Sequence, residues 1–192
     1  MKIFISGGCK NGKSFYAQRL AKTLIETQQT PLYYIATMKP VDAEDDERIL
    51  THKYEREGWG FITVEQPVNI QKILDRCEFC GSFLLDSLTA LLANEMFLPG
   101  GEINEDVTKK ITNALLKILT CIKNIVIVSD YIYSDVFEYC VMTEKYRKSL
   151  AEIDCFTAQN CDLVLEAVYS NIIVHKGSKI WPELWSKCEK IL

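Results

Sequence analysis

Short apolar runs alternate with segments of helical spacing along most of the chain. The run from Lys2 to Ser6 is rich in β-branched and aromatic residues and ends in two glycines, as a buried strand that leads into a turn does. Beyond Lys13, four apolar residues recur at the i, i+3, i+4 and i+7 positions of one helical face: Ala17, Leu20, Ala21 and Leu24. The chain is therefore predicted to open with a strand, a glycine loop and a helix.

The same two patterns continue to the C-terminal region. Apolar runs predict strands at residues 32–36, 61–65, 82–85 (ending at Asp86), 125–128, 163–168 and 172–175. Helical spacing, proline positions and acid-rich starts predict helices at residues 42–58, 67–76, 103–122 and 138–160. The last two strands are joined by Tyr169-Ser170-Asn171, a connection short enough for a hairpin.

This order predicts an α/β fold with a mostly parallel sheet, helices on both faces and an antiparallel edge strand near the C-terminus. A length of 192 residues is typical of one domain. We assign residues 1–177 to that domain and residues 178–192 to a helical extension of it. Five residues of the extension share one face: Trp181, Leu184, Trp185, Cys188 and Leu192. This face is expected to dock on the body or on a neighbouring subunit rather than to bind a ligand.

Composition narrows the class of protein. A formal net charge of −4 argues against a broad surface for nucleic acid, and no apolar run approaches the ~20 residues of a membrane span. The apolar N-terminal stretch is too short for a signal peptide, so the eight cysteines are expected to be reduced and the protein cytoplasmic. Cys77 and Cys80 form a single CxxC without a second pair, which favours small buried side chains over a structural metal.

The clearest motif is a phosphate-binding loop. Residues 7–14 read Gly7-Gly8-Cys9-Lys10-Asn11-Gly12-Lys13-Ser14 and match G-x-x-x-x-G-K-[S/T] between a predicted strand and a predicted helix. Backbone N–H groups of such a loop and the helix N-terminus bind a triphosphate. Lys13 is expected to contact the β and γ phosphates, and the Ser14 hydroxyl to ligate Mg²⁺. The alternative is a glycine turn with a surface lysine.

Asp86 ends the apolar strand Phe83-Leu84-Leu85, where a Walker-B carboxylate holds the Mg²⁺ shell. Many strands end in aspartate, so Asp86 is predicted to be a Walker-B carboxylate only because the chain also has the phosphate loop. Both motifs fall at the carboxyl ends of parallel strands, where ligands of such sheets bind.

Arg48, His52 and Arg56 recur every four residues of a predicted helix and share one stripe. A neutral imidazole is a nucleophile, and the flanking guanidinium groups favour a ligand that carries phosphate. The alternative is a solvated helix face whose arginines pair with Glu44, Glu55 or Glu57. The other histidine, His175, alternates with apolar residues along a strand and is expected to be structural.

Taken in order, these residues resemble the bifunctional adenosylcobinamide kinase/adenosylcobinamide-phosphate guanylyltransferase family of cobalamin biosynthesis. The likeness rests on the phosphate loop, on Tyr34-Ile35-Ala36-Thr37, on Arg48-Ile49-x-x-His52-Lys53-x-x-Arg56, on Thr63-Val64-Glu65 and on Leu84-Leu85-Asp86-Ser87-Leu88-Thr89. The segment around His52 is the most diagnostic, because ordinary P-loop kinases lack it.

The resemblance implies a RecA-like P-loop fold, a homotrimer and two reactions. The family phosphorylates adenosylcobinamide with ATP or GTP, and it transfers GMP from GTP to adenosylcobinamide phosphate through a guanylyl-histidine, here His52. Beside the catalytic residues His52 and Lys13, the family's nucleotide contacts map onto the phosphate loop and onto Thr37, Met38, Lys39, Lys53, Tyr54, Glu55, Arg56, Glu65 and Asp86. Mg²⁺ would be held by Ser14 and Asp86, and the other partner would be a corrinoid.

The likeness weakens after Ser129. The usual Asn-Glu-Val-Gly reads Asp130-Tyr131-Ile132-Tyr133, and the usual Gly-x-[Val/Leu]-Asn reads Ala151-Glu152-Ile153-Asp154. Two alternatives therefore stay open, namely a P-loop kinase for another small alcohol and a nucleotide-binding protein without catalysis.

Overall fold

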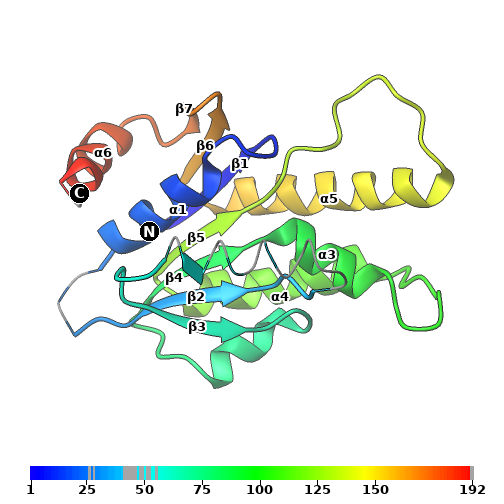
Figure 1. Ribbon diagram of the computed structural model, residues 1–192, viewed down its shortest axis with the longest axis horizontal. Helices are drawn as coiled ribbons and strands as arrows, with labels where there is room; N and C mark the ends of the chain where they lie inside the picture. Colours follow the sequence, from blue (N-terminus) through cyan, green and yellow to red (C-terminus); the bar gives the residue numbers. More distant parts are fainter. Residues whose placement is uncertain are drawn as a thin grey trace.

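A seven-stranded sheet runs through the molecule in the order β3-β2-β4-β5-β1-β6-β7 (Figure 1). This computed structural model describes residues 1–25, 27, 29–40, 47, 50, 53, 54 and 56–190. The strands are β1 Lys2–Gly7, β2 Leu32–Ala36, β3 Phe61–Glu65, β4 Ser82–Asp86, β5 Asn124–Val128, β6 Leu163–Val168 and β7 Asn171–Lys176. Only β7 is antiparallel to its neighbour. The predicted fold class is confirmed.

Helices cover both faces of this sheet. They are α1 Lys13–Thr23, the 3₁₀ helix η1 Ile70–Asp75, α3 Leu88–Met96, α4 Val107–Cys121, α5 Val141–Asn160 and α6 Trp181–Glu189. Strand β4 shows why two layers are needed, since Phe83 and Leu85 face the core beneath η1, α3, α4 and α5, whereas Leu84 faces the core beneath α1 and α6. A parallel strand buried on both faces is apolar at successive positions, as this one is.

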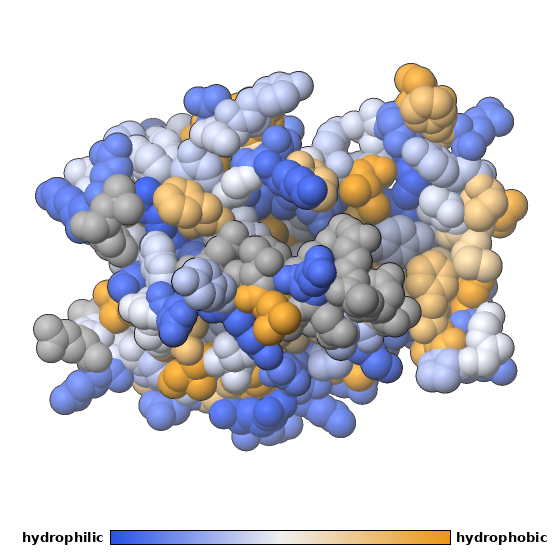
Figure 2. Space-filling model, viewed as in Figure 1, coloured by the Kyte–Doolittle hydropathy of each residue, from blue (hydrophilic) through white to orange (hydrophobic). Residues whose placement is uncertain are grey.

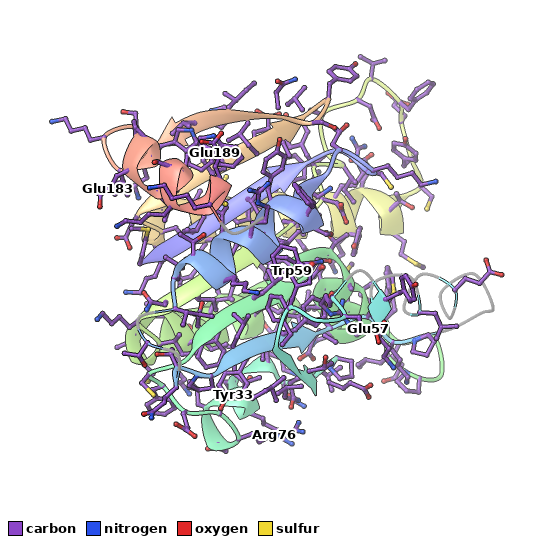
Figure 3. All side chains as sticks on the ribbon, turned by 60° about the vertical axis from the view of Figure 1, so that its left-hand side comes forward. Tyr33, Glu57, Trp59, Arg76, Glu183 and Glu189 are labelled. Atoms are coloured by element: carbon purple, nitrogen blue, oxygen red, sulfur yellow. The ribbon has the colours of Figure 1, made fainter. Side chains whose placement is uncertain are left out.

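The C-terminal helix α6 docks on the body of the same chain. Leu184 and Cys188 are buried in the core that α1 shares, and the Trp185 ring lies 5.7 Å from that of Tyr16. Figure 3 shows Glu183 and Glu189 of α6 on the side of the molecule opposite Tyr33 and Arg76, which lie near η1. Of the predicted apolar face, Leu192 lies outside the described residues.

Three predicted helices differ from the structure, and one observed helix was not predicted. The helix expected at 67–76 is a 3₁₀ helix of residues 70–75, because Asn69 adopts a left-handed conformation with φ 52° and its N–H donates to the buried Glu95. The helices expected from 103 and 138 begin at Val107 and Val141. Helix α3 was not expected, since it is buried on several sides and has no polar stripe. Most of the helix expected at 42–58 lies outside the described residues.

Packing around β4 generates a stability prediction. Leu85→Ala removes a fully buried side chain from the central sheet, so the free energy of unfolding should fall by about 2–5 kcal/mol in urea titrations. Leu116→Ala is the matched control, because that leucine is 49% exposed on α4 and its loss should change stability by less than about 0.5 kcal/mol. Equal effects of the two substitutions would contradict this placement of the core.

Candidate nucleotide site

The carboxyl ends of five parallel strands meet at one edge of the sheet. Ala36 of β2 pairs with both Glu65 of β3 and Asp86 of β4, and Asp86 pairs with Val128 of β5. Strand β1 enters the phosphate loop beside β5 at the same edge. The sheet therefore brings Ser14 of the phosphate loop and Asp86, 72 positions apart in sequence, to one edge of the molecule.

Lys13 is the central charge of the phosphate loop. Its ammonium group donates to the Gly8 carbonyl oxygen at 2.6 Å and forms an ion pair with Asp130 at 2.8 Å, and the residue is only 6% exposed. The alternative of a surface lysine is therefore wrong. A buried ammonium needs an anionic or acceptor partner, and a triphosphate supplies one in the same place.

Glycine is required at both ends of this loop. A Cβ on Gly7 would lie 2.4 Å from the Ala167 carbonyl oxygen of β6, which is too close for any side chain. Gly12, the residue before α1, has φ 82°, a left-handed conformation that favours glycine. Between them Cys9 and Lys10 are exposed and Asn11 is half-buried, and Ser14, two residues after Gly12, is also half-buried.

A chain of contacts links Asp86 to Arg56. Tyr34 of β2 donates its hydroxyl to Asp86 Oδ2 at 2.9 Å, and the Arg56 guanidinium lies 3.5 Å from the centre of the Tyr34 ring. Arg56 is 7% exposed, and its Nη1 has no hydrogen-bond partner in the described part of the chain. The solvated-face alternative does not hold for Arg56, and a buried guanidinium with a spare donor suits an anionic ligand.

Arg56 also lines a pocket of about 460 Å³ with Lys53, Glu57, Gly58, Gly60, Phe61 and Thr63. In Figure 3, Glu57 and Trp59 mark the chain segment on this side of the sheet, and the Lys22 ammonium of α1 lies 5.2 Å from the Trp59 ring. Lys53 is exposed, so the pocket offers two cationic side chains.

The other predicted site residues fall into three groups. Thr37 is fully buried: its hydroxyl is bonded to the backbone of Ser87, its N–H donates to the Asp86 carbonyl oxygen, and its own carbonyl accepts from the Asn94 side chain. Met38 is half-buried, whereas Lys39, Tyr54 and Glu65 are exposed. Arg48, His52 and Glu55 lie outside the described residues.

Sequence reasoning missed the carboxylates beside the loop. Asp130 pairs with Lys13, and its N–H donates to Thr89 Oγ1 at 2.9 Å. Behind it, buried Asp154 of α5 accepts hydrogen bonds from Ser129 and Tyr133, while its Oδ1 makes none to the described residues. Burial, with a smaller contribution from nearby Asp130, raises the pKa of Asp154 to about 7 against the opposing effect of those two hydrogen bonds. Both aspartates stood out only as departures from the family pattern.

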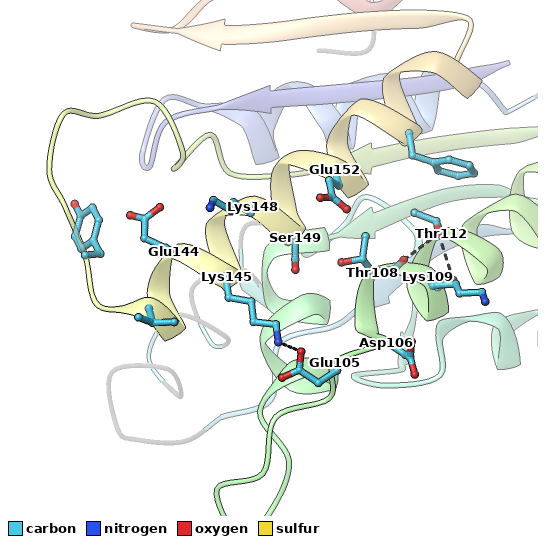
Figure 4. A pocket seen from close by; sticks show the side chains of 13 residues that line it. Glu105, Asp106, Thr108, Lys109, Thr112, Glu144, Lys145, Lys148, Ser149 and Glu152 are labelled. Atoms are coloured by element: carbon cyan, nitrogen blue, oxygen red, sulfur yellow. Dashed lines mark hydrogen bonds and ion pairs between the residues drawn. The ribbon is translucent and has the colours of Figure 1, made fainter.

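Two further features lie away from the phosphate loop. A charged groove of about 920 Å³ between α4 and α5 contains the Lys145–Glu105 ion pair (Figure 4) and is lined by no residue of the loop. The segment joining β5 to α5 carries apolar side chains at its apex (Figure 2), where Val136 is 95% exposed.

The described residues hold no cluster of three or more His, Cys, Asp or Glu side chains that suits a metal ion. In the same part of the chain, no helix has the length and apolar character needed to cross a bilayer.

The phosphate loop, its buried lysine and the carboxylates on the neighbouring strand ends define a P-loop nucleotide-binding protein. The chain belongs to the cobinamide kinase/cobinamide phosphate guanyltransferase family, whose model matches residues 3–172. The predicted family is thus confirmed, and with it membership of a class of transferases in cobalamin biosynthesis.

Solved structures resemble this chain at the level of the fold. A KaiC-like protein from the hyperthermophilic archaeon Pyrococcus horikoshii OT3 is similar with 16% identity and a TM-score of 0.52, over 91% of this chain and 78% of that one. The flagellar accessory protein FlaH from Methanocaldococcus jannaschii gives 13% identity and a TM-score of 0.45, over 91% and 77%. No curated protein matches the chain.

The raised pKa of Asp154 predicts a pH-dependent stability. Because the folded state holds this proton more tightly than the unfolded chain, whose value is near 3.8, the stabilisation is complete below pH 4 and is lost as pH rises to about 7. Asp154→Asn mimics the protonated acid, so relative to wild type it should gain stability across this range, by up to about 4 kcal/mol in urea titrations. Glu152→Gln, exposed on the same helix, should show no such trend. A stability difference between Asp154→Asn and wild type that is independent of pH would contradict the assignment.

Proposed function

We propose that this chain phosphorylates adenosylcobinamide with ATP or GTP and transfers GMP from GTP to adenosylcobinamide phosphate, giving adenosylcobinamide-GDP. The observation that carries the proposal is the buried Lys13 ammonium under a glycine loop, at the same sheet edge as Asp86, in a chain of this family. Such a charge favours a ligand with several phosphates.

In the kinase step, the acceptor hydroxyl oxygen attacks the γ-phosphorus and its proton passes to water, while the bond to the bridging oxygen breaks and the nucleoside diphosphate leaves with the electron pair. Lys13 and the loop N–H groups would position the phosphates. The Ser14 hydroxyl and the Asp86 carboxylate are hard oxygen donors that fit Mg²⁺. When bound there, the ion would neutralise phosphate charge.

In the transferase step, an imidazole nitrogen of His52 attacks the α-phosphorus of GTP, and pyrophosphate leaves with the electron pair of the broken bond. A phosphate oxygen of adenosylcobinamide phosphate then attacks the same phosphorus and releases the histidine. The role of His52 rests on its motif. Arg56, four residues later, adds support because its buried Nη1 makes no hydrogen bond to the described residues and could donate to a phosphate oxygen.

One observation supports a second candidate acceptor for the phosphoryl group. The segment after β5 departs from the family pattern at Asp130-Tyr131-Ile132-Tyr133 and exposes apolar side chains further along. A P-loop kinase for a different small alcohol would differ in this acceptor-side segment. Turnover of another alcohol, with none of adenosylcobinamide, would favour that second function.

The family resemblance also leads us to propose a homotrimer. One chain has a mass of 22.0 kDa, and light scattering coupled to size-exclusion chromatography should give three times that mass. A monomeric mass under the same conditions would contradict this assembly.

The proposed intermediate can be tested by labelling. Incubation with GTP labelled at the α-phosphate should give a protein adduct that is labile in acid and stable in alkali, as a phosphoramidate is. His52→Ala should reduce the label to background, at least ~100-fold, because it removes the nucleophile. The matched control is His175→Ala, since the second of the two histidines is exposed on β7 and pairs with Glu166. Equal labelling of His52→Ala and wild type would assign the nucleophile elsewhere.

A further inference from the structure

The turn between β6 and β7 places an aromatic ring beside the phosphate loop. The hairpin closes at the Val168–Asn171 pair, which leaves Tyr169 and Ser170 as its two loop residues. The Tyr16 hydroxyl of α1 donates to the Ser170 carbonyl oxygen at 2.6 Å, and a Cβ on Gly12 would lie 3.9 Å from Ser170 Oγ. The turn is therefore fixed against the start of α1 (Figure 1).

The residues in this turn are not those that the backbone favours. Tyr169 has φ 48° and Ser170 has φ 60°, so both occupy the left-handed region, where Asn and Gly are preferred in two-residue hairpin loops. An aromatic residue in this conformation is held there by its surroundings, here in part by the Asn171 side chain, which donates to the Tyr169 carbonyl oxygen. Despite this conformation, the Tyr169 ring is 84% exposed and so contributes little to the core.

The sheet order sets the direction in which a bound nucleotide leaves the loop. Asp86 ends β4 and Asp130 follows β5, so the carboxylates that suit the metal and the terminal phosphate lie on one side of β1. The β6–β7 turn lies on the other side of β1. A triphosphate with its charged end towards Asp86 therefore has its nucleoside end towards Tyr169.

Phe15 contacts the same Tyr16 that fixes the turn. It follows Ser14 in the first turn of α1, its ring is 49% exposed, and it packs edge-on against Tyr16 at 5.8 Å between centroids. Two exposed aromatic residues are thus linked through Tyr16: Phe15 by ring contact and Tyr169 by the hydrogen bond from Tyr16 to the neighbouring Ser170.

We infer that Tyr169 is a stacking platform for the purine base of the nucleoside triphosphate, with Phe15 at its border. The inference rests on the proposed nucleotide-binding function of the phosphate loop. Stacking on an aromatic face does not read the hydrogen-bonding edge of a base. The platform therefore serves adenine and guanine alike, which suits a chain that takes ATP or GTP.

The test compares ligands with and without a base. Calorimetric titration with ATP, GTP and inorganic tripolyphosphate, each with Mg²⁺, should give wild-type Kd values that are lower for the nucleotides. Tyr169→Asn removes the ring but suits the left-handed turn, so it should keep or raise the Tm. We expect it to weaken ATP and GTP binding by about tenfold and to leave tripolyphosphate unchanged.

Two variants sharpen the result. Tyr169→Phe keeps the ring and should restore nucleotide affinity to within about twofold of wild type. Tyr131→Ala removes an exposed ring on the β5 side of the loop and should not change the ratio of nucleotide to tripolyphosphate affinity.

Unchanged nucleotide affinity in Tyr169→Asn would overturn the platform, as would an equal loss for tripolyphosphate. Failure of wild type to bind any of the three ligands would instead overturn the proposed function, and the platform with it.

Discussion

The buried charge of Lys13 is the constraint on which the site depends. An ammonium group removed from water at this depth must be neutralised, and the Gly8 carbonyl and the Asp130 carboxylate do so. A triphosphate must compete with Asp130 for the same cation. The Asp130 carboxylate thus holds Lys13 in place within the loop. Breaking the Lys13–Asp130 ion pair would reduce the net free energy of phosphate binding.

The order of the parallel strands places different groups on the two sides of Lys13. Strands β4 and β5 bring Asp86 and Asp130 to one side of the loop, whereas the β6–β7 turn stands on the other. On the side of Asp86, Tyr34 of β2 contacts both the Asp86 carboxylate and the Arg56 guanidinium, so a second cationic side chain lies beyond β2. The cationic side chains of Lys13 and Arg56 therefore lie from β1 across to β2, and the exposed Tyr169 lies on the opposite side of β1.

The sequence predicted what depends on local pattern. The strands at 32–36, 61–65 and 163–168 and the loop at Gly7–Ser14 follow from short apolar runs and glycines, and they match the structure. Helix α3 was not predicted because burial on several sides removes the polar stripe. Ser87 is nevertheless a recognisable N-cap signal, since its side chain accepts a hydrogen bond from the Ala90 N–H. The pairing of Lys13 with Asp130 joins residues 117 positions apart, so no periodicity could have predicted it.

Asp130 and Asp154 show how a charged pair is accommodated beside a phosphate site. Both replace asparagines of the family pattern, yet they bring less negative charge than two carboxylates would. Burial raises the pKa of Asp154 to about 7, so near neutrality much of it carries a proton and resembles the amide it replaces. Asp130 is half-exposed, and its carboxylate forms an ion pair with Lys13. In the proposed nucleotide complex, phosphate would displace Asp130 from Lys13 and leave a carboxylate after β5, where a negative charge would favour a cation.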